Sequence, residues 1–111
     1  MKNIYSNILK NNNNNIGQVI KYLKKNHVVG IPTETVYGLA ANAYSDIAVK
    51  KIYKLKKRPI KNPLIIHYYN NSDLKKDCHF NKIFLKLYEK FCPGPITFIL
   101  NLKKISKISK I

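Results

Sequence analysis

The sequence predicts an α/β domain, because helix-like and strand-like patterns alternate along the chain. Apolar residues recur at helical spacing in three stretches, over residues 16–25, 45–56 and 81–92. Short apolar runs bounded by proline or glycine, typical of buried strands, occupy residues 28–31, 64–69 and 96–102. The length of 111 residues suits one domain.

The first half of the chain begins with a polar segment. An asparagine run at 11–15 has no apolar periodicity, so we expect residues 1–15 to form a flexible lead-in. The amphipathic helix from Ile16 follows, and then the strand that Pro32 closes. Residues 33–43 are predicted to be a loop, and Ser45 or Asp46 to cap the second helix.

The second half repeats this alternation. Two prolines bracket a turn before the strand at 64–69, and Ser72 with Asp73 is expected to open a short helix. Asn81 is expected to cap a longer helix, which Pro93-Gly94-Pro95 ends. Residues 103–111 repeat Ile-Ser-Lys with a period of three, so we expect a low-complexity basic tail after a domain spanning 16–102.

The chain carries a formal net charge of +16, from 21 Lys and Arg against 5 Asp and Glu. Such a surface attracts phosphate backbones, which favours a small basic RNA-binding module that contacts RNA without catalysis. The alternative is compositional. Codons poor in G and C encode Lys, Asn, Ile and Tyr, so mutational drift would enrich all four. The charge alone does not decide between them.

Cysteine use and hydropathy indicate a cytoplasmic protein. Cys78 and Cys92 form neither a disulfide framework nor a C-x-x-C zinc pair, so no metal site is predicted. No apolar signal region follows Lys2. The stretch 26–45 has the length of a membrane span, but Pro32, two glycines and several polar residues interrupt it. We therefore expect no membrane association.

Arg58 is the sharpest candidate for binding chemistry. It is the single arginine in a lysine-rich chain, and its planar fork can bond two phosphate or carboxylate oxygens at once. Lys56 lies beside it, so the pair predicts a small-anion site. The alternative is a stray exposed arginine within a solvated run of positive charges over residues 50–61.

Two further segments carry polar residues next to predicted strands. Pro32-Thr33-Glu34-Thr35 follows a strand, where α/β sheets place their binding crevices, although ordinary turn capping by threonine is equally compatible. His67 lies in an apolar strand, where it has a functional or a structural role. Neither a Walker lysine loop nor a G-x-G-x-x-G motif is present, which excludes the ordinary mononucleotide cradles.

Taken in order, these segments resemble one family. Residues 31–43 (IPTETVYGLAANA) resemble the signature of the YrdC/Sua5 family, and residues 56–59 (KKRP) are similar to its K-x-R-P element. Residues 62–67 (NPLIIH) resemble its N-P-L-hydrophobic-H segment, and residues 91–97 (FCPGPIT) its W-P-G-P-x-T turn. The resemblance implies a YrdC-like twisted mixed β-sheet with flanking helices.

The resemblance also implies an activity, that of a nucleotidyltransferase that forms threonylcarbamoyl-AMP from L-threonine, bicarbonate and ATP. The product serves N6-threonylcarbamoyladenosine modification of tRNA, with other threonylcarbamoylation proteins acting downstream. By motif match, Thr35 and His67 would contact L-threonine, and Arg58, Asn62 and Lys56 would contact ATP. Lys56 and Arg58 would be the catalytic cations, because a carbamate must approach the α-phosphate. Mg²⁺ would accompany ATP as substrate, with no tightly bound cofactor.

The resemblance covers the N-terminal half of the family's domain. The later part of that domain carries an Arg-x-Pro segment and a Ser-x-Asn element, and nothing in residues 101–111 resembles either. We therefore expect a truncated copy, which is a fragment, a decayed copy or half of a split enzyme. The sequence leaves open whether this chain is active alone.

Overall fold

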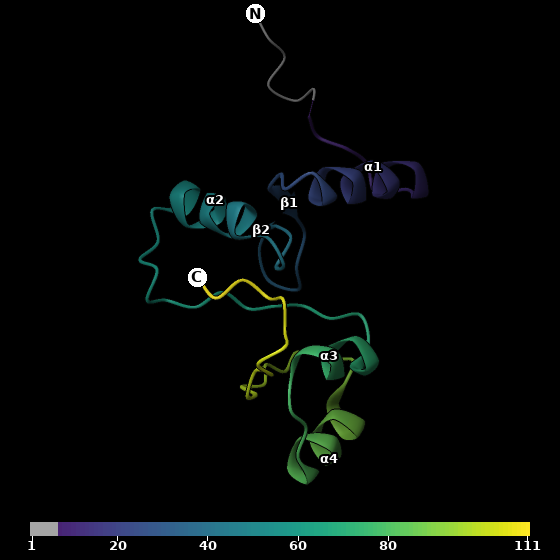
Figure 1. The fold of residues 1–111 in the computed structure, drawn as a ribbon. Helices are drawn as coiled ribbons and strands as arrows, with labels where there is room; N and C mark the ends of the chain where they lie inside the picture. The colour runs from purple at the N-terminus through teal and green to yellow at the C-terminus, as the bar shows by residue number, and fades with distance from the viewer. Residues whose placement is uncertain (1–6) are drawn as a thin grey trace, which may run out of the picture.

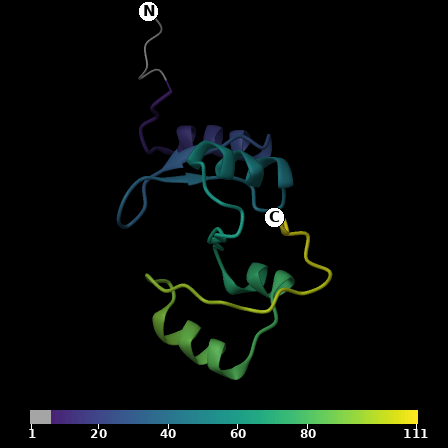
Figure 2. The same ribbon diagram turned by 90° about the vertical axis from the view of Figure 1, so that its left-hand side faces the viewer.

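The computed structural model describes residues 7–111, which form four helices and one two-stranded antiparallel sheet (Figure 1). The elements are α1 (Asn13–Lys24), β1 (Val29–Ile31), β2 (Gly38–Ala40), α2 (Asp46–Lys56), α3 (Asn71–Asp77) and α4 (Lys82–Phe91). Figure 2 shows two groups, α1 and α2 with the sheet above, and α3 with α4 below. Extended segments join the groups, and none of the described helices is both long and apolar enough to cross a lipid bilayer.

Each helix begins at a polar cap. The side chains of Asn12, Ser45, Asn70 and Asn81 each accept a hydrogen bond from the backbone N–H three residues later, which satisfies one of the free donors of a first turn. The caps predicted at Ser45 and Asn81 are thereby confirmed. Asn70 opens α3 slightly before the position expected from the sequence.

The asparagine run is partly helical. Helix α1 begins at Asn13, and the Asn15 side-chain amide donates to the Lys10 carbonyl at 2.8 Å. The expected flexible lead-in therefore fails over residues 13–15, because asparagine caps a helix well even where it contributes nothing to a core. Residues 1–6 of the lead-in lie outside the described residues.

The two strands form a hairpin. Val29, Gly30 and Ile31 pair with Ala40, Leu39 and Gly38, respectively. The predicted loop over residues 33–43 is therefore wrong for β2, whose three residues become a strand because β1 offers a partner for their backbone groups. Thr33 organises the connection. Its hydroxyl oxygen accepts from the N–H groups of Thr35 and Val36, both at 3.3 Å, and donates to the Val36 carbonyl.

The larger mixed sheet expected from the sequence does not form within the described chain. Residues 64–69 are not paired as a strand, and residues 96–102 make one isolated antiparallel bridge, between Leu102 and Cys78. Apolar β-type sequence becomes a strand only where a neighbouring strand presents its backbone donors and acceptors. The α/β class is confirmed, whereas the predicted strands at 64–69 and 96–102 lack such partners.

The core is small and divided between the two groups. In the upper group, the buried face of α2 consists of Ala48, Val49, Ile52 and Tyr53. In the lower group, Phe84 is 3% exposed and its ring packs against three other aromatic rings at centroid distances of 4.5–5.6 Å. These rings belong to Phe80, Tyr88 and Phe98.

Asp77 is the last residue of α3, in the lower group, and is 4% exposed. Its Oδ2 accepts hydrogen bonds from the hydroxyl groups of Tyr44 at 2.5 Å and Tyr68 at 2.9 Å. Its Oδ1 accepts one from Ser106 Oγ at 2.6 Å. Burial alone would raise the pKa of Asp77, but these three donors, with the charge of Lys103, lower the pKa below its ordinary 3.8.

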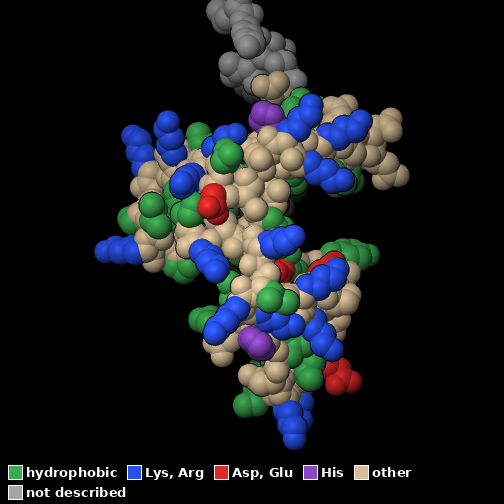
Figure 3. All heavy atoms as spheres, viewed as in Figure 1, with side chains coloured by type: hydrophobic (Ala, Val, Ile, Leu, Met, Phe, Trp, Pro, Cys, Tyr) green, Lys and Arg blue, Asp and Glu red, His purple; other side chains and the backbone are tan. Residues whose placement is uncertain are grey.

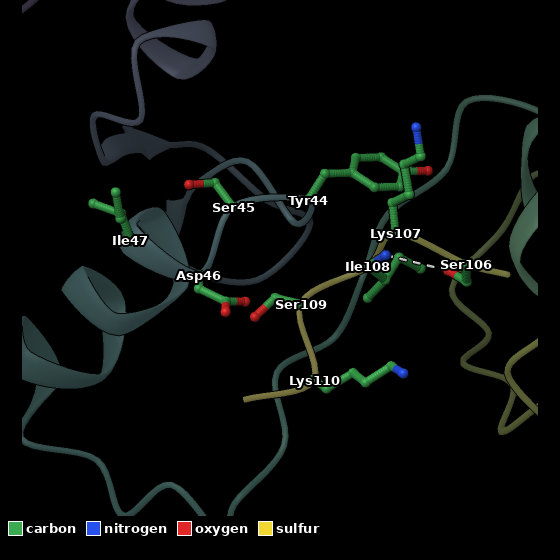
Figure 4. A pocket seen from close by; sticks show the side chains of 9 residues that line it. All are labelled: Tyr44, Ser45, Asp46, Ile47, Ser106, Lys107, Ile108, Ser109 and Lys110. Atoms are coloured by element: carbon green, nitrogen blue, oxygen red, sulfur yellow. Dashed lines mark hydrogen bonds between the residues drawn. The ribbon is translucent and has the colours of Figure 1, made fainter. Parts of the chain in front are cut away.

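The last nine residues pack against the rest of the chain without regular secondary structure. The Lys103 N–H donates to the Asp77 carbonyl at 2.7 Å, and the Ser109 N–H donates to the Ala43 carbonyl at 2.9 Å. Ile108 is 7% exposed. Figure 4 shows residues 106–110 running past the start of α2. The segment expected to be a tail thus links the lower group to the upper one.

Replacing Phe84 with alanine is expected to lower the free energy of unfolding by about 3 kcal/mol, since the change empties the centre of the aromatic cluster. Urea unfolding followed by circular dichroism measures the difference. Ile83→Ala is the control on the same helix, because Ile83 is 70% exposed. Equal losses in the two variants would contradict the packing described for α4.

Acid is expected to destabilise the fold through Asp77. Because the folded pKa of Asp77 lies below the ordinary 3.8, the unfolded chain binds more protons between the two pKa values. The stabilising contribution is present above pH 3.8 and is lost as the pH falls below 3.8 and through the lower folded pKa. Urea unfolding at a series of pH values from neutral to acid measures this contribution. Asp77→Asn should lower stability at neutral pH by about 1–3 kcal/mol and flatten the acid dependence. An unchanged acid slope in Asp77→Asn would exclude this explanation.

Candidate functional site

A groove of about 780 Å³ opens between the hairpin, the buried side of α2 and the extended segment 63–69. The C-terminal residues Ile108, Ser109 and Ile111 form another part of its wall. The groove is lined mostly by apolar atoms. One of the lining residues, Ile65, is 64% exposed to solvent. The groove therefore offers apolar surface and a few polar groups to a ligand.

His67 is the predicted site residue that lines this groove. It belongs to the extended segment 64–69, next to Tyr68, whose hydroxyl is bound to Asp77. Thr33 also lines the groove, whereas Thr35 is exposed in the hairpin connection and lies outside the lining. The side-chain hydroxyl of Thr33 is engaged in hydrogen bonds within that connection.

Arg58 holds the turn that follows α2. Its Nε donates to the Asn62 carbonyl at 3.2 Å, and its Nη2 donates to the Pro63 carbonyl at 3.0 Å. The Tyr53 hydroxyl donates to the same Asn62 carbonyl at 2.9 Å. The structure thus brings Arg58 next to Asn62, whose backbone carbonyl accepts its hydrogen bond, while their predicted contacts with ATP stay a prediction. Arginine has five N–H donors, so this arrangement leaves donors for an anion.

The end of α2 sets the position of the basic residues. Lys57 adopts a left-handed conformation with φ of 49°, and its N–H bonds to the carbonyls of Tyr53 and Lys54. Lys56 is the last helical residue and is exposed, as is Arg58. The carbonyl end of a helix favours positive charge, which stabilises this cluster of cations.

The turn and the groove are contiguous. Arg58 bonds to the carbonyl of Pro63, and Pro63 is part of the groove lining, which continues through the segment to His67. Of the five predicted site residues, Lys56, Arg58, Asn62 and Thr35 lie outside the lining itself. The structure therefore supplies cations at one end of the groove and an imidazole within it.

The surface around the site is positively charged. Figure 3 shows Lys and Arg side chains over much of the visible face of the molecule, with few acidic groups among them. Within residues 7–111 one ion pair is present, between Lys76 and Asp73 at 2.6 Å. The same residues contain no group of three or more histidine, cysteine or acidic side chains that could hold a metal ion. Anions are thus the ligands that this surface favours.

Two other features, a second depression and a buried cysteine, are weaker candidates for a functional site. A shallower depression of about 550 Å³ lies between the first turn of α2 and residues 106–110 (Figure 4), and none of the predicted site residues line it. Cys78 is buried, and burial raises the pKa of its thiol, which makes the thiolate less available.

Comparison with known proteins identifies relatives that share this chain's motifs. The profile of the Sua5, YciO and YrdC family, described as "Telomere recombination", matches residues 21–111, and thus includes the segment expected to be a tail. A threonylcarbamoyl-AMP synthase of Bacillus subtilis is 46% identical over 96 residues, which cover 86% of this chain and 28% of that protein. A threonylcarbamoyl-AMP synthase of Histophilus somni is 40% identical over 94 residues, covering 81% of this chain and 51% of that protein.

A solved structure gives the same result. The structure of Sua5 from Pyrococcus abyssi aligns with a TM-score of 0.79 and 36% sequence identity, over 85% of this chain and 28% of that one. The chain spans about a quarter to a half of the length of these relatives. Since the profile covers residues 21–111 and the folds agree, the chain belongs to the YrdC/Sua5 family and is a homologue of threonylcarbamoyl-AMP synthases.

Proposed function

We propose that this chain acts in the formation of threonylcarbamoyl-AMP from L-threonine, bicarbonate and ATP, for the threonylcarbamoyladenosine modification of tRNA. The observation that carries the proposal is the contiguity of the turn held by Arg58 with the groove that contains His67. The identity to threonylcarbamoyl-AMP synthases supports it, although this chain corresponds to part of those enzymes.

The residues divide into two sets in this proposal. Arg58, Asn62 and Lys56 bind ATP at the turn, and His67 with Thr35 binds L-threonine. The guanidinium group of Arg58 is held by two backbone carbonyls, and the ammonium group of Lys56 lies two residues before it in the sequence. In this proposal both cations lie where negative charge develops in the transition state. They are therefore assigned the catalytic role, through electrostatic stabilisation rather than covalent catalysis.

The proposed reaction brings two anions together. The amine of L-threonine takes up the carbon of bicarbonate with loss of water, which gives a carbamate. A carbamate oxygen then attacks the α-phosphorus of ATP, and the bond between the α-phosphorus and the bridging oxygen breaks to release pyrophosphate. The protein lowers this barrier by positioning the reactants and by neutralising the repulsion between them. Mg²⁺ would enter with the phosphates of ATP, where it keeps most of its ligands from substrate and water.

Arg58→Lys tests the proposal. Purified chain is incubated with ATP, L-threonine and bicarbonate, and pyrophosphate release is measured. Release should require all three substrates, and the variant should slow it by roughly 10²-fold, because lysine cannot hold the Asn62 and Pro63 carbonyls together and still contact a phosphate.

Lys61→Gln is the matched control, since it removes a neighbouring exposed charge outside the motif. It should leave the rate within about twofold of the parent. Absence of release from the parent chain, or equal losses in the two variants, would contradict the proposed activity.

A basic RNA-binding surface is a second candidate function, and the orientation of α2 favours it. The buried face of α2 fixes the helix, so that its basic residues and those of the following turn are exposed. The seven residues are Lys50, Lys51, Lys54, Lys56, Lys57, Arg58 and Lys61. Lys51 Nζ bonds to the Asn26 carbonyl at 2.8 Å, and the other lysines make no ion pair within the described chain.

Removing positive charges from α2 and the residue after it tests whether RNA binds this surface or responds only to the net charge of the protein. The triple change Lys50→Gln, Lys54→Gln and Lys57→Gln should weaken binding of a single-stranded RNA about tenfold, and lower the slope of log K against log salt by about 2. Fluorescence anisotropy at several salt concentrations measures both quantities.

The control carries the same charge loss on α4, by Lys82→Gln, Lys86→Gln and Lys90→Gln, all exposed lysines. Equal effects of the two triple changes would show that RNA responds to net charge alone, which would exclude a specific surface on α2.

A further inference from the structure

The segment that carries His67 is held by few contacts. Residues 64–69 are extended but belong to no sheet. Their one hydrogen bond to the rest of the described chain is donated by the Tyr68 hydroxyl to Asp77 Oδ2 at 2.9 Å. The placement of this segment therefore depends on a side chain rather than on a β ladder.

The acceptor of this bond is itself fixed. Asp77 ends α3, and its carboxylate also accepts from Ser106 at 2.6 Å and from Tyr44 at 2.5 Å. Its backbone carbonyl accepts from the Lys103 N–H at 2.7 Å. A buried carboxylate with several donors stays ionised, and its hydrogen bonds are stronger than those between neutral groups. Asp77 is thus a rigid anchor to which the hydroxyl of Tyr68 attaches.

His67 is one residue from this anchor point. Consecutive Cα atoms lie about 3.8 Å apart, so a displacement of Tyr68 moves His67 with it. Arg58 and Asn62, by contrast, are held by hydrogen bonds within the turn and by Tyr53, none of which involves Asp77. The two ends of the groove therefore depend on separate contacts.

We propose that Asp77, acting through the hydroxyl of Tyr68, is a positioning residue that holds His67 in the groove independently of the turn around Arg58. The expected effect on L-threonine binding rests on the proposed function. The positioning of His67 by Asp77 does not rest on it, since it is argued from the hydrogen bonds of Asp77 alone.

Tyr68→Phe in the full chain tests the proposal, because it removes one hydroxyl and keeps the ring. Backbone ¹⁵N relaxation reports the order of residues 64–69. Order parameters at Ile66 and His67 should fall from about 0.85 to below about 0.6. The Kd for L-threonine should rise about tenfold, corresponding to about 1.4 kcal/mol, while the Kd for ATP should stay within about twofold.

Tyr44→Phe is the matched control, since it removes a phenol hydroxyl from the same oxygen of Asp77. It should lower overall stability and leave the order of His67 unchanged. If Tyr68→Phe does not fold, the relaxation measurement is made on Asp77→Glu, which displaces the acceptor by one methylene and should also loosen residues 64–69.

The outcomes separate the two proposals. Unchanged order at His67 in Tyr68→Phe, or an equal loss in Tyr44→Phe, would overturn the positioning role of Asp77. Loss of order confined to Tyr68→Phe, together with no binding of L-threonine by the parent chain, would uphold the positioning role and reject the proposed role of His67 in threonine binding.

Discussion

The carboxylate of Asp77 connects segments that the secondary structure leaves apart. It accepts hydrogen bonds from the loop before α2, from the segment beside His67 and from the C-terminal residues, through Tyr44, Tyr68 and Ser106. The burial of Asp77 makes these donors necessary, since an unpaired buried carboxylate would cost several kcal/mol. Three donors offset that cost and fix three segments at one point. This cluster joins the two groups of helices, whereas the two-stranded sheet of the described chain lies within the upper group.

The candidate site depends on two arrangements, one of which is local in the sequence and the other of which is not. Arg58 fixes the turn after α2 by bonding to the carbonyl groups of Asn62 and Pro63, an arrangement contained within six consecutive residues. The position of His67, in contrast, depends on the hydrogen bond from Tyr68 to Asp77, which lies nine residues after Tyr68 in the sequence. The basic end of the groove is therefore a local structure, whereas the imidazole end is a tertiary one.

The helices were predictable from the sequence, and the sheet was only partly so. Ser45 and Asn81 cap the helices expected of them, because an asparagine or serine before an apolar periodic run satisfies the first-turn N–H groups locally. The turn at Pro93-Gly94-Pro95 is equally local, since a Cβ on Gly94 would collide with the carbonyl oxygen of Phe91. The strand at 38–40 and the unpaired segment at 64–69 could not be predicted, because pairing depends on which backbone lies alongside.

The amino-acid sequence by itself determined the position of the helices, the basic run over residues 50–61 and the motifs that mark the YrdC/Sua5 family. These depend on capping, periodicity and residue type, which act over a few neighbouring residues. The tertiary structure decided that Asp77 is an anchor and that residues 103–111 pack against the chain, with Ile108 buried. Neither was evident in the sequence, since a lone aspartate and an Ile-Ser-Lys repeat acquire meaning only when distant donors and apolar surfaces meet them in space.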